Sequence, residues 1–143
     1  MKQQGFTLIE TVVVIGLISI LISAGVMTIS LVNNARFNKA VNEVEQAVVY
    51  ARQATVFTGQ EHNVYCFSNR VLVRRGVGKP IYTVRLGEEV YIPSDCTGRR
   101  LYFCDSMAVV KAGTIELISK TTGRQAKITV SVATSKVTTR YIN

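Results

Sequence analysis

The 143-residue sequence contains no tryptophan, two prolines and a single histidine, His62. One histidine leaves the chain without the usual ligand set for zinc. A nucleophile–base pair would almost have to use His62, which we expect to be a solvated residue of the polar loop before the first strand. We therefore expect no enzyme, no metal site and no cofactor.

Acidic residues are also scarce, because 9 Asp and Glu stand against 17 Lys and Arg and give a net charge of +8. Such an excess suits an anionic partner, such as nucleic acid, cell-wall polymer or lipid headgroups. A solvated surface that keeps the protein soluble explains it equally well. Composition alone leaves both interpretations open.

Charge is missing altogether from residues 11–32, which form an apolar run. About 20 such residues span the hydrocarbon core of a bilayer, so the run predicts a transmembrane helix. A cleaved secretory signal has a shorter apolar region of roughly 7–15 residues. The small residues at 23–25 keep that second interpretation open. Charge counting on the two sides of the run does not orient the helix.

The helix is expected to continue beyond the apolar run, from about Phe6 to about Phe57. Apolar residues recur at spacings of three and four and form one stripe. Gly59 is a suitable stop, because glycine accepts the left-handed conformation just after a helix. The stripe consists of Phe37, Val41, Val44, Val48 and Ala51, widened by Ala40, Ala47 and Ala54.

From residue 62 the hydrophobic period changes to two, which indicates short strands rich in Val, Ile, Thr and Tyr. The expected fold class is α+β, with a long N-terminal helix packed on a C-terminal antiparallel sheet domain. The strand candidates are residues 62–67, 70–75, 81–86, 90–92, 101–104, 114–119, 126–132 and 137–142.

Glu10 lies just before the uncharged run and is the residue that most strongly suggests a function. A carboxylate in a membrane helix is costly and marks a functional site by default. Near a helix end the side chain could simply reach the interface. Alternatively, it could pair with a cation such as the free amino terminus of another copy, which would fix the offset between neighbours. Both explanations are open on physical grounds.

The stretch KQQGFTLIE resembles the class III signal of type IV pilins and type II secretion pseudopilins. The resemblance implies that a prepilin peptidase cuts between Gly5 and Phe6 and N-methylates Phe6. It also implies that Glu10 pairs with the terminal amine of an adjacent subunit during assembly. The implied organisation is a leader (1–5), a membrane and assembly half of the helix (6–32), an amphipathic half (33–58) and a globular sheet domain (59–143).

The late segment, residues 113–142, looks like the C-terminal end of proteins in the H-type pseudopilin and FimT-like minor pilin branch. Its sequence is GTIELISKTTGRQAKITVSVATSKVTTRYI. This implies a minor structural subunit of a type IV pilus-like or type II secretion filament. The alternative is a plain single-pass, membrane-anchored binding protein or enzyme. Some members of that branch bind DNA through basic residues. The corresponding candidates here are Arg99, Arg100, Arg124, Lys127, Lys136 and Arg140.

The same resemblance implies a chain in the cytoplasmic membrane with its N-terminus inside, which later joins an extracellular or periplasmic filament. The implied partners are other pilin or pseudopilin subunits, the prepilin peptidase, the inner-membrane assembly platform, membrane lipid before assembly, and DNA. In an oxidising exterior, Cys96 and Cys104 are expected to form a disulfide. Cys66 with Cys104 is the alternative pair, and free buried cysteines are a third outcome.

Overall fold

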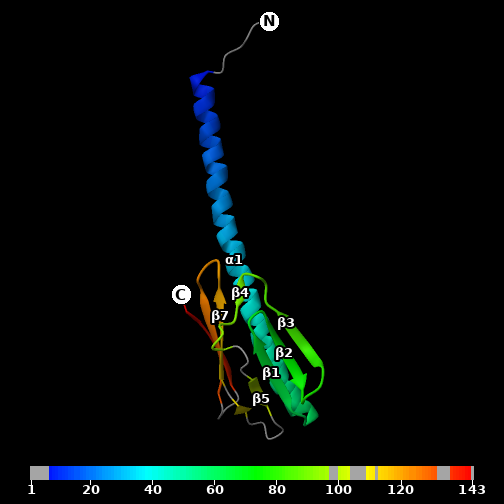
Figure 1. The fold of residues 1–143 in the computed structure, drawn as a ribbon. Helices are drawn as coiled ribbons and strands as arrows, with labels where there is room; N and C mark the ends of the chain where they lie inside the picture. The colour runs from blue at the N-terminus through cyan, green and yellow to red at the C-terminus, as the bar shows by residue number, and fades with distance from the viewer. Residues whose placement is uncertain (1–6, 97–99, 104–108, 112, 132–135, 143) are drawn as a thin grey trace. The chain divides into compact units, whose positions relative to one another are not determined.

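The computed structural model describes residues 7–96, 100–103, 109–111, 113–131 and 136–142. The helix α1 (Leu8–Thr58) comes first, and strands follow in the rest of the described chain (Figure 1). This order confirms the predicted α+β fold class. The chain divides into two compact units, an amino-terminal unit (Met1–Ala35) and a carboxy-terminal unit (Arg36–Asn143), which are described in turn.

The amino-terminal unit contains the first part of α1, which presents apolar side chains on all sides. An 18-residue window of this helix has a mean hydropathy of 2.6 and none of it is buried, so by length and composition the helix could cross a membrane. Its hydroxyl groups bond within the helix: Ser19 Oγ donates to the Ile15 carbonyl at 2.8 Å, and Ser23 Oγ to the Ser19 carbonyl at 2.9 Å. Such internal bonds satisfy polar groups where water is absent.

In the carboxy-terminal unit, the rest of α1 buries one stripe of side chains, and the predicted stripe is confirmed. Ala54 is half-buried, and the stripe continues at Thr55, whose Oγ1 donates to the Ala51 carbonyl at 2.9 Å. Gly59 has φ 64° and its N–H donates to the Thr55 carbonyl at 2.9 Å, so it ends the helix as predicted. The buried members are Phe37, Ala40, Val41, Val44, Ala47, Val48, Ala51 and Thr55.

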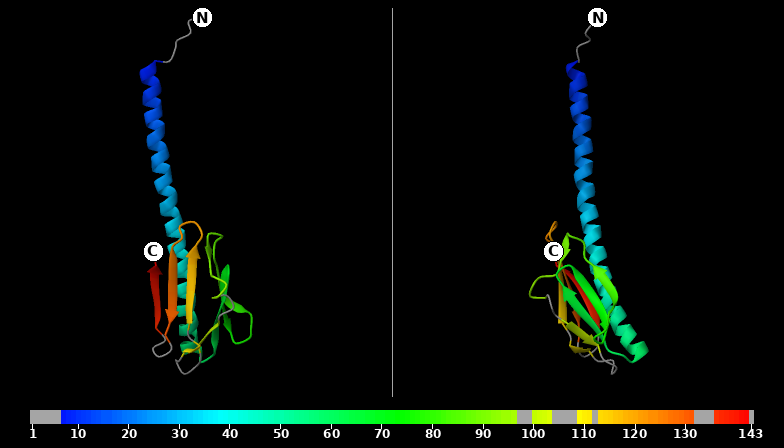
Figure 2. Two further views of the ribbon diagram at one scale, coloured as in Figure 1. Left: turned by 60° about the vertical axis from the view of Figure 1, so that its left-hand side comes forward. Right: turned by 45° about the vertical axis from the view of Figure 1, so that its right-hand side comes forward.

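The strands form two sheets, all of whose neighbouring pairs are antiparallel (Figure 2). Sheet A has the order β3-β2-β1-β5-β6 and sheet B the order β4-β7-β8-β9. The bounds are β1 His62–Phe67, β2 Arg70–Arg75, β3 Pro80–Arg85, β4 Val90–Tyr91, β5 Arg100–Phe103, β6 Val109–Lys111, β7 Gly113–Ser119, β8 Gln125–Val130 and β9 Val137–Ile142.

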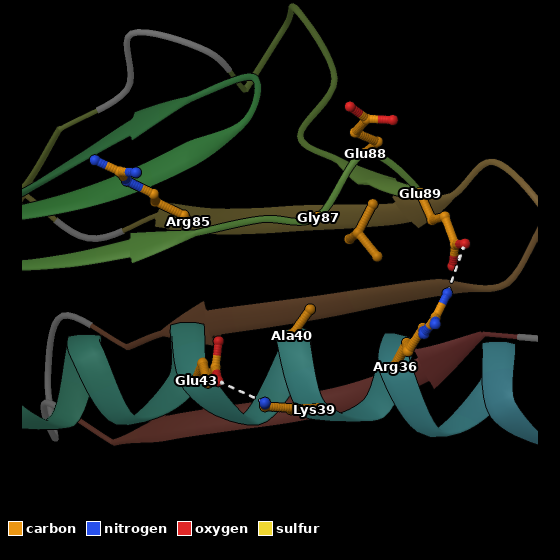
Figure 3. Close-up of a pocket in the computed structure, with 9 residues that line it drawn as sticks. Arg36, Lys39, Ala40, Glu43, Arg85, Gly87, Glu88 and Glu89 are labelled. Carbon is orange, nitrogen blue, oxygen red and sulfur yellow. Dashed lines mark hydrogen bonds and ion pairs between the residues drawn. The ribbon is translucent and has the colours of Figure 1, made fainter.

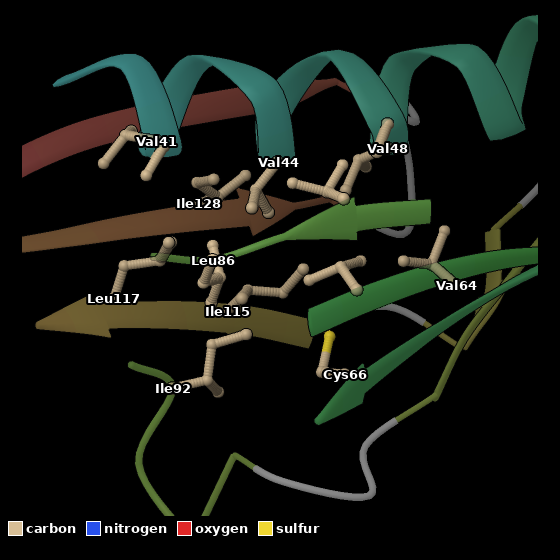
Figure 4. Packing of buried hydrophobic residues seen from close by; sticks show 14 of the residues in the cluster. Val41, Val44, Val48, Val64, Cys66, Leu86, Ile92, Ile115, Leu117 and Ile128 are labelled. Atoms are coloured by element: carbon tan, nitrogen blue, oxygen red, sulfur yellow. The ribbon is translucent and has the colours of Figure 1, made fainter. Parts of the chain in front are cut away.

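One hydrophobic core joins the amphipathic part of α1 to both sheets (Figure 4). Residues that pair across neighbouring strands share a face of the sheet. In sheet A, Val64 pairs with Val73, and both are fully buried. In sheet B, Ile115 pairs with Ile128, and both are buried. Together with Val44 of α1 they belong to one buried cluster, which fixes which face of each sheet points inward.

Three features differ from the expectations. The strands divide between two sheets, and β6 was not predicted. His62 was predicted to be solvated, and this is wrong, because it opens β1 and is only 2% exposed. Strand alternation puts it on the same face as Val64. Its Nδ1 lies 2.8 Å from the Gln60 carbonyl oxygen and 3.1 Å from Thr55 Oγ1, so local polar partners satisfy the buried ring.

Candidate functional site

The start of α1 is capped by Thr7, three residues before Glu10. The Glu10 N–H lies 3.1 Å from the Thr7 carbonyl oxygen and 3.4 Å from Thr7 Oγ1. With the helix beginning at Leu8, Thr7 occupies the N-cap and Glu10 the third helical position, the pattern of a capping box. Sequence reasoning missed this cap by Thr7, although the Thr-x-x-Glu spacing was the signal for it.

The surroundings of the Glu10 carboxylate are apolar. Its neighbours Leu8 and Ile9 are 86% and 73% exposed, and Val13 is exposed as well. Glu10 is the one acidic or basic residue of α1 before Arg36. Within the described residues it forms no ion pair. A carboxylate at the positive end of a helix dipole is locally favourable, and its oxygens stay available to a cation from another molecule. Gly5 and Phe6 lie outside the described residues.

Arg124 and Lys127, two of the predicted nucleic-acid residues, make contacts within the carboxy-terminal unit. The Arg124 guanidinium lies over the rings of Phe37 and Tyr141 at 5.6 and 5.8 Å, and its Nη1 is 3.5 Å from Asn38 Oδ1. Lys127 Nζ forms an ion pair with Glu116 Oε1 at 3.2 Å. Both cations therefore make contacts between side chains of the carboxy-terminal unit.

The remaining predicted cations are dispersed. Arg140 is exposed and pairs with Lys127 across β8 and β9, and Lys136 is exposed just before β9. Arg100 lies in β5 of the other sheet, and Arg99 is outside the described residues. The structure does not bring the described members of this set together on one face.

Two of the three cysteines lie in the interior. Cys66 on β1 is 1% exposed and Cys96 is 4% exposed, and neither forms a disulfide with another described residue. Burial, and to a smaller degree the neighbouring Cys96, together raise the pKa of the Cys66 thiol to about 12. Cys104 lies outside the described residues, so both predicted disulfides remain predictions.

Asp95, Cys96 and Glu116 bring two carboxylates and a thiol together, with their ligand atoms all within 4.8 Å of one another. Sequence spacing did not indicate this group, because Glu116 comes from a strand of sheet B. The ammonium group of Lys127 already neutralises the Glu116 carboxylate. We assign no metal site here.

A groove of about 580 Å³ lies beside α1, under the turn at residues 87–89 (Figure 3). Arg36 Nη1 and Glu89 Oε1 are 3.1 Å apart, and Lys39 Nζ and Glu43 Oε1 are 3.9 Å apart. Glu88 extends away from α1. Charges of both signs are exposed in this groove, and four of them form these two pairs, an arrangement that suits a weak polar contact.

Known proteins give two matches. A family model described as the prokaryotic N-terminal methylation motif matches residues 1–26. The fold is similar to that of the minor pseudopilin EpsH from the type 2 secretion system of Vibrio cholerae, with a TM-score of 0.55. The sequences are 13% identical, and the match covers 75% of this chain and 96% of the EpsH chain.

The motif at the N-terminus and the fold agree with the resemblance to type IV pilins and pseudopilins. No curated protein matches the sequence. Pilins and pseudopilins are structural subunits that assemble with other pilin subunits, and an exposed apolar helix fits a membrane-anchored precursor of such a filament. In this pilin-like chain, the helix start and the globular surface are the two candidate sites.

Proposed function

We propose that the pilin-like chain is a minor structural subunit, without enzymatic activity, of a type IV pilus-like or type II secretion filament. The observation that carries this proposal is the start of α1. A single carboxylate, Glu10, lies at the start of an otherwise uncharged, exposed apolar segment, within the methylation motif that matches residues 1–26. The similarity to EpsH supports a minor subunit through the fold.

Processing is the first step of the proposal. A prepilin peptidase cuts between Gly5 and Phe6 on the cytoplasmic side and methylates the new amino group of Phe6. The chain then waits in the cytoplasmic membrane with its globular domain outside, until the assembly platform adds it to the filament. The match to the methylation motif over residues 1–26 supports this order.

Registration is the second step, and it depends on Glu10. An unpaired charged side chain in hydrocarbon is costly: insertion measurements give about 3 kcal/mol for each charged residue. The terminal amine of an adjacent subunit would supply a counter-charge in low dielectric, so pairing would favour one axial offset between neighbours. The lack of an ion pair for Glu10 among the described residues supports this role.

Mass analysis of the mature N-terminus tests the processing step. We expect the loss of residues 1–5 and one added methyl group on Phe6. An intact leader, or a cut after residue 24 or 25, would contradict the proposal and favour the rival, a plain membrane-anchored binding protein or enzyme.

Substitution of Glu10 separates registration from helix capping. Glu10→Gln keeps the capping box, which accepts glutamine at this position, but it removes the charge. We expect Glu10→Gln and Glu10→Ala to be cleaved normally and both to be missing from isolated filaments. The matched control is Thr7→Val, which removes the capping hydroxyl and keeps the carboxylate; it should still assemble. Normal assembly of Glu10→Gln would show that the carboxylate acts only within its own helix.

The disulfide is a further part of the proposal. A bridge between Cys96 and Cys104 would link the two ends of the segment that contains β5 once the domain is outside the cytoplasm. Peptide mapping without reduction should recover these two cysteines in one linked pair, with Cys66 as a free thiol. A link between Cys66 and Cys104, or three free thiols, would contradict it.

Contact with DNA is the second candidate function, and the charge of the globular unit favours it. Residues 36–143 carry 16 Lys and Arg against 8 Asp and Glu. Binding of this kind neutralises phosphates, so it is independent of sequence and falls steeply with salt. A gel-shift at low and high salt decides this point: no retention at low salt removes DNA from the proposal and leaves the filament role intact.

A further inference from the structure

Sheet A has an outer face rich in arginine, which we call the basic face. Alternation along β1 places Val64 and Cys66 inward in the core, so Tyr65 and Phe67 point to the opposite side. Cross-strand partners share that side. The cations of the basic face are Arg70 and Arg74 on β2, Arg85 on β3, Arg100 on β5 and Lys111 on β6.

The strand register establishes that these cations share one face. Tyr65 pairs with Arg100. Arg70 pairs with Phe67 on one side and with Arg85 on the other. Asn63 of β1 pairs with Arg74 of β2 and with Tyr102 of β5. Tyr102 in turn pairs with Lys111 of β6, so Arg74 and Lys111 share this face. The face therefore carries a cation on four of its five strands.

Aromatic rings hold three of these guanidinium groups over the sheet. The Tyr65 ring lies 5.3 Å from Cζ of Arg74 and 5.8 Å from Cζ of Arg100. Arg100 Nη1 also donates to Tyr65 Oη at 3.4 Å. The Phe67 ring lies 5.1 Å from Cζ of Arg70. A ring positions a guanidinium without neutralising its charge. The side chain is therefore partly ordered before any ligand binds, and binding loses less conformational entropy.

The five strands of sheet A contain no Asp or Glu. Arg70, Arg74 and Arg85 form no ion pair with any residue that the structure describes. Sheet B is different, since its outward Lys127 is paired with Glu116. The excess of positive charge is therefore larger on sheet A, because the strands of sheet B hold two cations, Lys127 and Arg140, against Glu116.

We propose that the basic face of sheet A binds the phosphate backbone of a nucleic-acid strand. Arginine binds phosphate through two parallel hydrogen bonds, and four of the five cations are arginines. Arg70 and Arg74 are four residues apart on β2, roughly 13 Å at the strand rise, a span that calls for a polymer with repeated charges. The proposal rests on the DNA contact proposed above and moves it from the dispersed C-terminal cations to this face.

The test uses the full-length chain in non-ionic detergent and a fluorescein-labelled single-stranded DNA of about 30 nucleotides. Binding is followed by anisotropy between about 50 and about 200 mM salt. The triple variant Arg70→Gln/Arg74→Gln/Arg85→Gln should bind more than about tenfold more weakly. Its slope of log affinity against log salt should be shallower by about 2, because three phosphate contacts at about 0.7 each are lost.

The matched control is Lys120→Gln/Lys136→Gln/Arg140→Gln, which removes the same net charge away from the basic face. It should keep the parent's salt slope and bind within about threefold of the parent. Equal losses in the two triple variants would show that net charge alone drives binding and would overturn the assignment to this face.

A charge-neutral variant tests the positioning role of the ring. Tyr65→Leu should weaken binding by about threefold to tenfold, as one stacking contact is worth about 1–3 kcal/mol in single-strand binding. Its salt slope should be unchanged, since no cation is removed. Parent-like affinity would contradict the positioning role. Thermal unfolding of each variant checks folding; if the triple variant does not fold, Arg70→Gln alone should reduce the slope by about 0.7.

Two outcomes separate this inference from the proposed function. If the parent chain does not bind DNA even at low salt, both the DNA contact and the basic face are overturned, while the filament role stands. If poly-glutamate competes as well as DNA at equal charge, the face is a general polyanion surface and the assignment to nucleic acid is wrong.

Discussion

The two parts of α1 have opposite relations to their surroundings. Before residue 36 the helix exposes large apolar side chains on every side, for example Leu21 at 72% and Leu31 at 70%. After residue 36 it buries one stripe and exposes charge on the other side. Among the described residues, the large apolar side chains of the first part stay exposed, whereas the second part completes the core of a domain. Stability should therefore depend on the second part, and assembly on the first.

The largest expected effect comes from an acid placed in the buried stripe. Val48 is fully buried, so Val48→Asp would bury an unpaired carboxylate and should leave the carboxy-terminal unit largely unfolded. All six tyrosines lie after residue 36, so near-ultraviolet circular dichroism reports on this unit alone. The control Val14→Asp lies in the exposed part and should leave the tyrosine signal intact. A native spectrum for Val48→Asp would contradict the view that stability depends on the second part of α1.

A second prediction concerns pH and the core thiol. Burial raises the pKa of Cys66 to about 12, from 9.0 in the reference state. Above pH 9 the unfolded chain loses this proton and the folded chain keeps it. The free energy of unfolding should therefore fall with rising pH, by about 1.4 kcal/mol per unit, up to the folded pKa. Urea unfolding of the parent and of Cys66→Ala checks this. The variant should lack this slope, and equal slopes would exclude Cys66 as the cause.

Glycine substitutions give a smaller contrast between the two parts. Gly59 has φ 64°, so Gly59→Ala should lower the free energy of unfolding by about 1 kcal/mol. Gly16 lies in the exposed part, where an added Cβ meets nothing within 4 Å. Gly16→Ala should leave the unfolding of the domain unchanged. Urea denaturation measures both, and a loss of stability in Gly16→Ala would show that the two parts are energetically coupled.

The smallest expected effect is at the ion pair of the groove. The side chains of Arg36 and Glu89 are 64% and 37% exposed, so water screens their attraction. Arg36→Gln should change the free energy of unfolding by less than about 1 kcal/mol. The same measurement at high salt should show no difference from the parent. A larger loss would mean that the groove contributes to the stability of the domain.

Much of this fold could be predicted because its signals are local. The period of the stripe from Phe37 to Ala51, the stop at Gly59 and most strands follow from nearby residues. The division into two sheets was not predicted, because β1 pairs with β5 and β4 with β7 across long stretches of chain. Such partner choices depend on how the core closes, and sequence pattern does not reveal them.

The candidate site shows the same division between local and distant information. The charge of Glu10 and its apolar context could be read from the sequence, and the capping box was readable but missed. The basic face could not be predicted, because Arg70, Arg85 and Arg100 come from separate strands. Only the register reveals that they share a side. His62 was misjudged because a polar residue at the first position of a strand gives no sign of its face.

The cap at Thr7 has a consequence for the processed chain. Cleavage before Phe6, as proposed, would leave Thr7 as the second residue, so the new amino group would sit beside the first turn of α1. The free N–H groups there already make that end of the helix positive. A protonated amine would add a second positive charge at the same place, and the two would repel each other in a medium of low dielectric. The Glu10 carboxylate of the same chain lies in that first turn and offsets part of this positive charge, and docking against a neighbour's carboxylate would offset the rest.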